Sequence, residues 1–341
     1  SDRTKQDWQT LSTLLTTPKK LVIVGHKNPD GDAVGSCLGL YWYLKRKGHD
    51  PVVLMPNDFP EFLKWMPGCQ DIVIYEKEIE HTKELLEHAE MVFTLDFNAL
   101  NRTGELGEVL ASTKSIFVMI DHHQQPDHYA QFTYSDTTMS STCEMVYHTI
   151  GALGDQHLIS ADIATNLYTG IMTDTGSFKF SATTPRTHRV VADLLEAGAV
   201  HHEIHHHIYD TQSPDRLRLL GKALANLVIR AEYNLAYITI TQDELEAHNF
   251  KKGDTEGFVN YALSVAGVVF AVIFIENKNE GIIKMSLRSK GDFSVNDFAR
   301  NYFHGGGHTN AAGGKFDGSM ADAIAFLMKQ VPQYKNQLNA I

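Results

Sequence analysis

The chain has 341 residues, more than one hydrophobic core usually serves, so we expect two domains. Hydrophobic residues make up 43% of it and charged residues 21%, which is typical of a globular protein rather than a disordered or fibrous one. Asp and Glu number 41 against 30 Lys and Arg, and the net charge of −11 disfavours a protein that coats long duplex nucleic acid.

Cysteine content and hydropathy indicate where in the cell the protein is expected. The three cysteines, Cys37, Cys69 and Cys143, are too few and too scattered for a disulfide framework or a thiolate metal site. A reducing cytoplasm is therefore the expected location. No apolar run approaches the about 20 residues that span a bilayer, and the first residues lack the apolar region of a signal peptide, so we expect no membrane association.

The first two hundred residues alternate short β-branched runs with longer helical patterns. Strands are predicted at residues 21–24, 51–55, 72–75, 91–95 and 116–120, and helices at 33–47, 141–150 and 161–172. Continuous apolar strands separated by helices indicate a parallel sheet with helices on both faces. We therefore expect an α/β fold, with residues 1–200 as its first domain.

A second pattern follows. Strands are predicted at residues 236–240, 267–275 and 282–287, and helices at 257–264, 295–302 and 320–331. The intervening residues 201–230 are helical in pattern and polar, so we expect a helical connector there. Residues 231–341 would then form a smaller α/β domain.

Polar side chains follow three of the predicted strands in the first domain. His26 comes after the first strand, Asp96 after the fourth, and the triplet Asp121-His122-His123 after the fifth. Each is weak evidence alone, and Pro29-Asp30-Gly31-Asp32 also fits a turn that caps the next helix. Because ligands gather at the carboxyl ends of parallel strands, we expect these groups at one edge of the sheet.

The charges of these groups indicate metal ions. Four carboxylates clustered without a counter-charge would repel one another, and two divalent cations would balance them. Oxygen and imidazole ligands suit Mn²⁺ or Mg²⁺ better than structural zinc, with Co²⁺ also open. Two neighbouring cations can stabilise an in-line displacement at phosphorus. The candidate metal ligands are His26, Asp30, Asp32, Asp96, His122 and Asp174.

The order of these segments resembles the DHH phosphoesterase superfamily. Its motifs stand here as His26-x-Asn28-x-Asp30-x-Asp32, Asp96, Asp121-His122-His123 and Asp174-Thr175-Gly176. The resemblance implies that His26 and Asp30 hold one cation, that Asp32 and His122 hold the other, and that Asp96 bridges them while Asp174 completes the shell. It also implies that the catalytic groups are Asp96, His123, which would face the substrate, and Asp121, which would orient a neighbour.

A glycine-rich segment marks the second domain, His304-Gly-Gly-Gly-His308-Thr-Asn-Ala-Ala-Gly-Gly314. It fits neither a dinucleotide-binding fingerprint nor a P-loop, and a flexible turn is the simple alternative. Glycine amides can approach phosphate, however, and the stretch from residue 281 to 315 carries five cations against two acids. Arg288 within it could bind phosphate bidentately.

This segment resembles the DHH-associated domain. The resemblance implies that Arg288, Gly306, Gly307 and His308 bind a nucleotide in a cleft between the two domains. The subgroup most similar is that of nanoRNases and pAp phosphatases, which implies a Mn²⁺-dependent hydrolase of short oligoribonucleotides and 3′,5′-bisphosphates. Long duplex nucleic acid is not an expected partner, and a homodimer is left open.

Several alternatives stay open from the sequence. His202-Glu203-Ile-His-His206 matches a zinc-protease pattern, but five histidines in seven positions make a chance match easy, and a solvated helix face explains them better. Other functions of the same fold are cyclic- or linear-dinucleotide hydrolysis, inorganic pyrophosphatase or exopolyphosphatase activity, and a non-catalytic nucleotide sensor.

Overall fold

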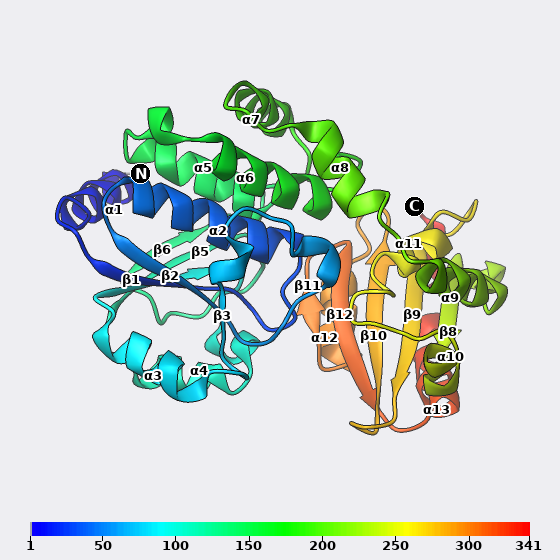
Figure 1. The fold of residues 1–341 in the computed structure, drawn as a ribbon. Helices are drawn as coiled ribbons and strands as arrows, with labels where there is room; N and C mark the ends of the chain where they lie inside the picture. The colour runs from blue at the N-terminus through cyan, green and yellow to red at the C-terminus, as the bar shows by residue number, and fades with distance from the viewer. Residues whose placement is uncertain (1) are drawn as a thin grey trace. The chain divides into compact units, whose positions relative to one another are not determined.

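The computed structural model describes residues 2–341, which form two compact units that meet in sequence at Thr211 and Gln212 (Figure 1). Among the helices of these described residues, none has the length and apolar character that crossing a bilayer requires.

The first unit contains a six-stranded sheet in which every neighbouring pair is parallel. Its strands are β1 (Lys20–Val24), β2 (Asp50–Met55), β3 (Val73–Ile74), β4 (Met91–Leu95), β5 (Ile116–Asp121) and β6 (Phe132–Ser135). The spatial order is β3-β2-β1-β4-β5-β6, so the direction of winding reverses between β1 and β4. In sheets of this kind, the ligand crevice lies at that reversal, beyond the carboxyl ends of the strands.

Helices cover both faces of this sheet, as the apolar strands predict (Figure 1). On β1, Leu21 and Ile23 pack in one core with α2 (Gly31–Arg46), α5 (Thr142–Ala152) and α6 (Ala161–Asp174). Val22 and Val24 point to the other face and pack in a second core with α3 (Ile79–His88) and α4 (Leu106–Ser112). The predicted parallel α/β domain is therefore confirmed.

Other elements of this unit went unpredicted or differ in length. The strand predicted at residues 72–75 is reduced to two residues, and β6 was missed because it is only four residues long and partly exposed. The remaining helices are α1 (Asp2–Leu14), α7 (Pro185–Glu196) and α8 (His201–Tyr209). Short 3₁₀ turns lie at Glu61–Leu63, Cys69–Asp71, Leu100–Thr103 and Gln156–Leu158.

Two glycines allow α2 to lie unusually close to α6. A Cβ on Gly35 would lie 2.5 Å from the carbonyl oxygen of Asn166, and a Cβ on Gly31 would lie 2.3 Å from Oγ1 of Thr173. Neither approach tolerates a side chain. The close contact brings the first turn of α2 against the last turn of α6, where two of the predicted metal ligands lie.

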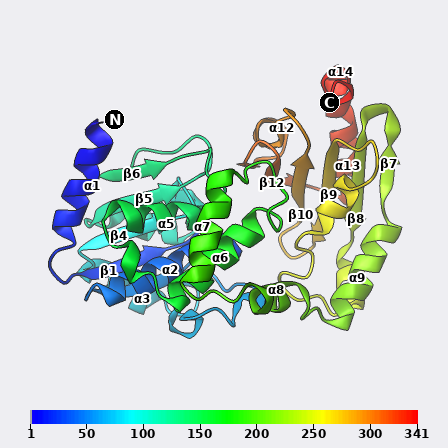
Figure 2. The same cartoon turned by 90° about the horizontal axis from the view of Figure 1, so that it is seen from above.

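The second unit contains a mixed six-stranded sheet in the order β11-β12-β10-β9-β8-β7, with β7 at one edge (Figure 2). Only β8 and β9 are parallel; the other pairs are antiparallel. The strands are β7 (Val228–Arg230), β8 (Leu235–Ile240), β9 (Phe270–Asn277), β10 (Ile282–Ser289), β11 (Gly306–Gly307) and β12 (Ala311–Asp317). The short β7 and the glycine-rich β11 and β12 were not predicted.

Helices lie on both faces of this sheet as well. One core includes α12 (Val295–Tyr302) and α13 (Met320–Gln330), and the other includes α9 (Pro214–Ala225) and α11 (Phe258–Leu263). Smaller elements are α10 (Gln242–Ala247), α14 (Lys335–Asn339) and 3₁₀ turns at Ala231–Tyr233 and Val331–Tyr334.

Candidate metal centre

The structure brings the six predicted metal ligands of the first unit together. The loops after β1 and β4 carry His26 and Asp96, and the chain just after β5 carries His122. Helix termini supply the others: Asp30 precedes α2, Asp32 lies in its first turn, and Asp174 is the last residue of α6. The group lies at the β1–β4 reversal of the sheet, as the positions of the strand ends predict.

Two clusters of donor atoms share Asp96. In the first, Nε2 of His26 lies 3.7 Å from Oδ1 of Asp30 and 3.3 Å from Oδ2 of Asp96. In the second, Nε2 of His122 lies 3.5 Å from Oδ1 of Asp96, 3.6 Å from Oδ2 of Asp32 and 3.4 Å from Oδ2 of Asp174. Asp96 thus turns a different oxygen towards each cluster.

Backbone carbonyls orient both imidazoles. Nδ1 of His26 lies 2.8 Å from the carbonyl oxygen of Lys27, and Nδ1 of His122 lies 3.2 Å from that of Met139. Because a carbonyl only accepts, Nδ1 carries the proton in each neutral ring. Nε2 is then the nitrogen that presents a lone pair to the clusters, the arrangement typical of metal-binding histidines.

The pKa values of the clustered side chains indicate whether cations fit this set of donor atoms. Burial, followed by repulsion from Asp96 and Asp174, raises the pKa of Asp32 well above its ordinary value. Burial also raises the pKa of Asp174, to about 7. Burial lowers the pKa of His122, but Asp96, Asp174 and Asp32 together raise it well above its ordinary value. Without cations the cluster therefore takes up protons, and divalent cations would supply the same positive charge.

His123 and Asp121 form a separate pair beside the clusters. Nδ1 of His123 donates to Oδ1 of Asp121 at 2.6 Å, and the backbone N–H of His123 donates to Oδ2 at 2.9 Å. Asp121 is fully buried and holds both the ring and the backbone of its neighbour. Nδ1 is therefore committed to Asp121.

Two asparagines outside the predicted motifs, Asn57 and Asn98, support the loops of the site. The backbone N–H of Asn28, which has a positive φ of 56°, donates to Oδ1 of Asn57, and the Asn57 amide donates back to Oδ1 of Asn28. Asn98 donates to the carbonyls of His123 and Gln124. No local pattern marks Asn57 or Asn98, since their partners lie 25 to 29 positions away.

The turn interpretation of Asp30 also holds. Asp30 is the N-cap of α2, and its Oδ1 accepts from the backbone N–H of Ala33 at 3.0 Å. The same oxygen lies 3.7 Å from Nε2 of His26. Capping and membership of the cluster are therefore compatible roles of one carboxylate.

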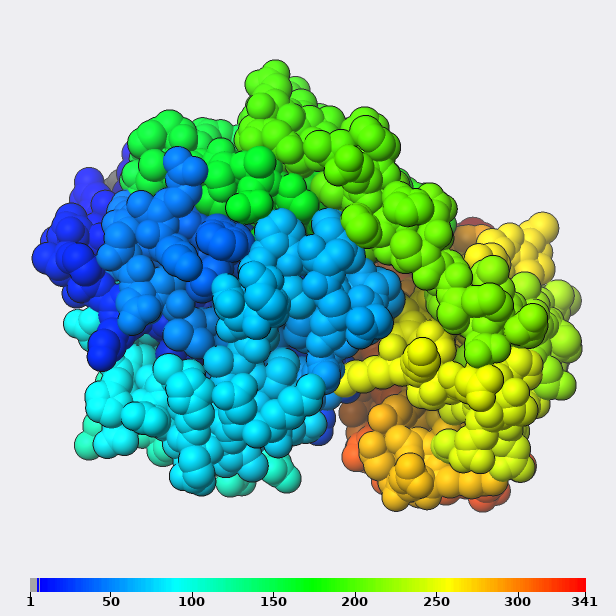
Figure 3. Space-filling view, in the orientation of Figure 1, coloured from blue at the N-terminus to red at the C-terminus, as the bar shows by residue number. Residues whose placement is uncertain are grey.

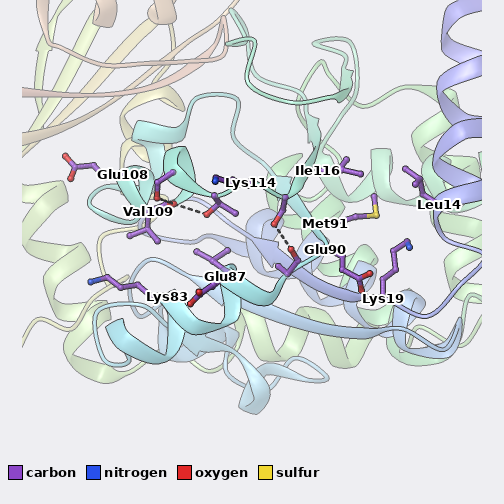
Figure 4. A pocket seen from close by; sticks show the side chains of 15 residues that line it. Leu14, Lys19, Lys83, Glu87, Glu90, Met91, Glu108, Val109, Lys114 and Ile116 are labelled. Atoms are coloured by element: carbon purple, nitrogen blue, oxygen red, sulfur yellow. Dashed lines mark hydrogen bonds between the residues drawn. The ribbon is translucent and has the colours of Figure 1, made fainter.

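A hollow lies at the opposite edge of the same sheet, where β4 and β5 begin (Figure 4). It is lined by three lysines, Lys19, Lys83 and Lys114, and by three glutamates, Glu87, Glu90 and Glu108. The charges balance, and these side chains form no cluster of metal-competent donors among the described residues. The candidate metal ligands thus lie at the carboxyl edge of the sheet, away from this hollow.

Two histidines of α8 pack against their own unit, and His201, His202 and His206 are exposed. His207 stacks on Trp65 with ring centroids 4.4 Å apart, and His205 contacts the carbonyl of His201 and the hydroxyl of Ser177. The helix forms part of the surface of the first unit, in green in Figure 3. Within residues 2–341, no group of three or more metal-competent side chains includes a residue of α8, so the zinc-peptidase alternative gains no support.

The glycine-rich segment of the second unit forms strands rather than an open loop. Gly306 and Gly307 of β11 pair with Gly313 and Ala312 of β12. The N–H of Gly307 donates to Oδ1 of Asn296, and that of His308 to the carbonyl of Ala311. These two amides are thus engaged within the unit, which differs from the predicted cradle of amides for phosphate.

Arg288 lies on β10 directly opposite Ala311 of β12. It shares a face of the strand with Lys284 and Ser286, while the alternate residues of β10 are buried in the core. Its Nη1 donates to the carbonyl of Leu287. Arg288 is therefore close to the glycine-rich strands in this unit, and its role in binding a substrate remains a prediction.

The first unit is a doubly wound α/β domain with carboxylates and imidazoles clustered beyond its strand ends. This is the architecture of a metal-dependent hydrolase. Comparison with known proteins identifies the family. Residues 20–171 match the DHH family, N-terminal domain, and residues 232–336 match the DHHA1 domain. The bifunctional oligoribonuclease and PAP phosphatase NrnA of Thermus thermophilus is 32% identical over 298 residues, 87% of this chain and 84% of that protein. The chain belongs to the DHH family of phosphoesterases and is a hydrolase of phosphoester bonds.

Solved structures agree on the fold. The crystal structure of an exopolyphosphatase-related protein from Bacteroides fragilis has a TM-score of 0.92 and 39% identity, covering 98% of this chain and 97% of that one. RecJ from Thermus thermophilus in complex with Mn²⁺ has a TM-score of 0.56 and 14% identity, covering 98% of this chain and 55% of that one. The second likeness concerns the fold alone.

Proposed function

We propose that this protein hydrolyses short oligoribonucleotides and 3′,5′-bisphosphates such as pAp, using two divalent cations, with Mn²⁺ as the preferred ion. The observation that carries the proposal is the position of Asp96, whose two oxygens face two different histidine clusters. One carboxylate between two clusters is the geometry that a pair of bridged cations requires. The substrate class follows the name of the relative from Thermus thermophilus.

In this proposal each cluster holds one cation. His26 and Asp30 would hold the first, and His122, Asp32 and Asp174 the second, with Asp96 shared between them. Bound cations would lower the pKa of a water molecule and neutralise charge on the phosphate. Mixed imidazole and carboxylate donors without thiolate favour Mn²⁺ or Mg²⁺, and RecJ with a related fold binds Mn²⁺.

The side chain of His123 is proposed to act on the substrate. Asp121 holds its Nδ1, so Nε2, when the ring carries both protons, can donate a hydrogen bond to a phosphoryl oxygen or a proton to the leaving oxygen. The buried carboxylate also fixes the orientation of the His123 ring. Asp121 therefore acts through His123 and needs no contact with the substrate.

The second unit is proposed to bind the rest of the nucleotide. Arg288 would hold a phosphate, and Gly306, Gly307 and His308 would allow its close approach. With the amides of Gly307 and His308 engaged within the unit, this role falls mainly on the side chains of Arg288 and His308. The glycines would then contribute by having no side chains that could block the approach of the phosphate.

Hydrolysis of a substrate panel tests the proposal. Asp96 has a positive φ of 65°, which asparagine tolerates well, so Asp96→Asn removes the shared charge without straining the backbone. We expect turnover of pAp and of two-to-five-residue RNAs with Mn²⁺, and a loss of at least about 1,000-fold in Asp96→Asn. The matched control is Asp127→Asn, an exposed carboxylate in the loop after β5. Mn²⁺-dependent turnover in Asp96→Asn close to that of the wild type would rule out the shared-ligand model.

A second candidate is hydrolysis of polyphosphate or pyrophosphate. It is favoured by the similar structure from Bacteroides fragilis, which is described as exopolyphosphatase-related. The panel therefore includes both compounds. Turnover of polyphosphate well above that of pAp and short RNA would favour this candidate, and turnover of no phosphoester would favour a nucleotide sensor.

A further inference from the structure

The N-terminus of α5 contacts two of the candidate metal ligands at once. The backbone N–H groups of Thr142 and Cys143 donate to the two oxygens of Asp32, at 2.8 and 2.9 Å. The hydroxyl of Thr142 donates to Oδ1 of Asp96 at 2.9 Å. Thr142 is fully buried, so water does not compete for these hydrogen bonds. One residue thus connects a ligand on α2 with a ligand after β4.

We propose that Thr142 is a positioning residue that sets the orientation of Asp96 between the two metal clusters. The proposal rests on the proposed function, because it concerns the same cations. The torsion that rotates a carboxylate about its own axis is soft, so a carboxylate needs a partner to fix its plane. The Thr142 hydroxyl holds Oδ1 on the side of His122, which leaves Oδ2 on the side of His26.

The hydrogen bonds of Asp32 complete this arrangement. A carboxylate oxygen has two lone pairs, so each oxygen can accept one amide and still offer a lone pair to a cation. Ser141 caps α5 by accepting from the N–H of Glu144, and the two preceding amides are thereby left for Asp32. Because helix N-termini favour negative charge, the first turn of α5 attracts the carboxylate of Asp32 and fixes its plane.

Thr142 is distinguishable from a threonine that only stabilises the helix. Thr149 lies in the same helix, is equally buried, and donates its hydroxyl to the carbonyl of Met145 at 2.9 Å. This hydroxyl bonds to the backbone of its own helix and not to a candidate metal ligand. Replacing either threonine by valine removes one buried hydroxyl and leaves nearly the same shape. Only the loss of the hydroxyl at Thr142 should weaken the binding of the cations.

The test compares Thr142→Val, Thr142→Ser and Thr149→Val in the full chain. The Mn²⁺ dissociation constant is measured by titration calorimetry, and the melting temperature of each variant is measured in EDTA. We expect Mn²⁺ to bind about 10- to 100-fold more weakly to Thr142→Val, as is usual when a hydrogen bond to a metal ligand is lost. Thr142→Ser keeps the hydroxyl and should restore the affinity to within about threefold.

The kinetic readout separates positioning from binding of the substrate. In Thr142→Val the Mn²⁺ concentration for half-maximal activity should rise in parallel with the dissociation constant, while KM for pAp at saturating Mn²⁺ stays unchanged. Thr149→Val should change the melting temperature alone.

The proposal is overturned if Thr142→Val binds Mn²⁺ as the wild type does, or if Thr149→Val weakens binding equally. Failure of the proposed function gives a different result: the wild type hydrolyses neither pAp nor short RNA. Mn²⁺ binding by the three variants still decides the role of Thr142 in that case.

Discussion

Replacing Asp121 by asparagine tests how the pair of His123 and Asp121 works. Asp121 accepts from Nδ1 of His123 at 2.6 Å and from its backbone N–H at 2.9 Å. Asparagine has the same shape but loses the charge, and its NH₂ group cannot accept the Nδ1 proton. A hydrogen bond to a buried charge contributes about 1.5–3 kcal/mol, so its loss in the transition state lowers kcat about 10- to 150-fold.

The assay is steady-state hydrolysis of pAp at saturating Mn²⁺, with KM and the Mn²⁺ dissociation constant measured alongside. Because Asp121 acts through His123, the double variant with His123→Gln should be no slower than His123→Gln alone. A further loss of about tenfold in the double variant would refute this reasoning. A large change in Mn²⁺ affinity would also refute it, by placing Asp121 among the metal ligands.

Two further predictions follow from the titrating groups. The apparent affinity for Mn²⁺ should rise from about pH 6 to about pH 8, because Asp174, with a pKa of about 7, must lose its proton to bind the ion. A Mn²⁺ dissociation constant that does not change with pH in titration calorimetry would contradict this. Burial raises the pKa of Asp155, but hydrogen bonds from Lys47 and Tyr43 bring it below its ordinary value. These hydrogen bonds stabilise the fold above pH about 3.9, the pKa of Asp155 in the unfolded chain, and the stabilisation is lost as the pH falls. Asp155→Asn should therefore lower the free energy of unfolding by about 1–2 kcal/mol at neutral pH. In urea denaturation the difference should shrink towards about pH 2, and a constant difference would contradict the assignment.

The ligands and the supports of the metal centre were predictable to different degrees. Asp96 could be found because it follows an apolar strand, and His26 because it follows another. Thr142 could not, because it lies 46 positions from Asp96 and 110 from Asp32 along the chain. A hydrogen bond between distant residues leaves no periodic signal in the sequence, and a threonine at the start of a helix has an ordinary local explanation.

The strands β11 and β12 of the glycine-rich segment were not predicted from the sequence. Consecutive glycines suggest an open loop, since glycine disfavours strands. In the second unit, Gly306 and Gly313 nevertheless pair in adjacent strands. A Cβ on Gly305 would lie 1.8 Å from the carbonyl oxygen of Gly313, so the close approach of two backbones explains this glycine. This close contact between the two backbones fixes the extended conformation of the segment only once both strands have formed.

The sequence by itself predicted which side chains could carry the chemistry of this protein: carboxylates and imidazoles after apolar strands, in the order of the DHH motifs. It also predicted the parallel α/β domain that carries them. These features are local, because burial and strand propensity act over a few residues. Only the tertiary structure decided that β1 and β4 are neighbours, that Asp96 turns its two oxygens to two clusters, and that α5 holds Asp32 and Asp96 together. Those contacts depend on how whole helices and strands pack, which no short segment of the chain specifies.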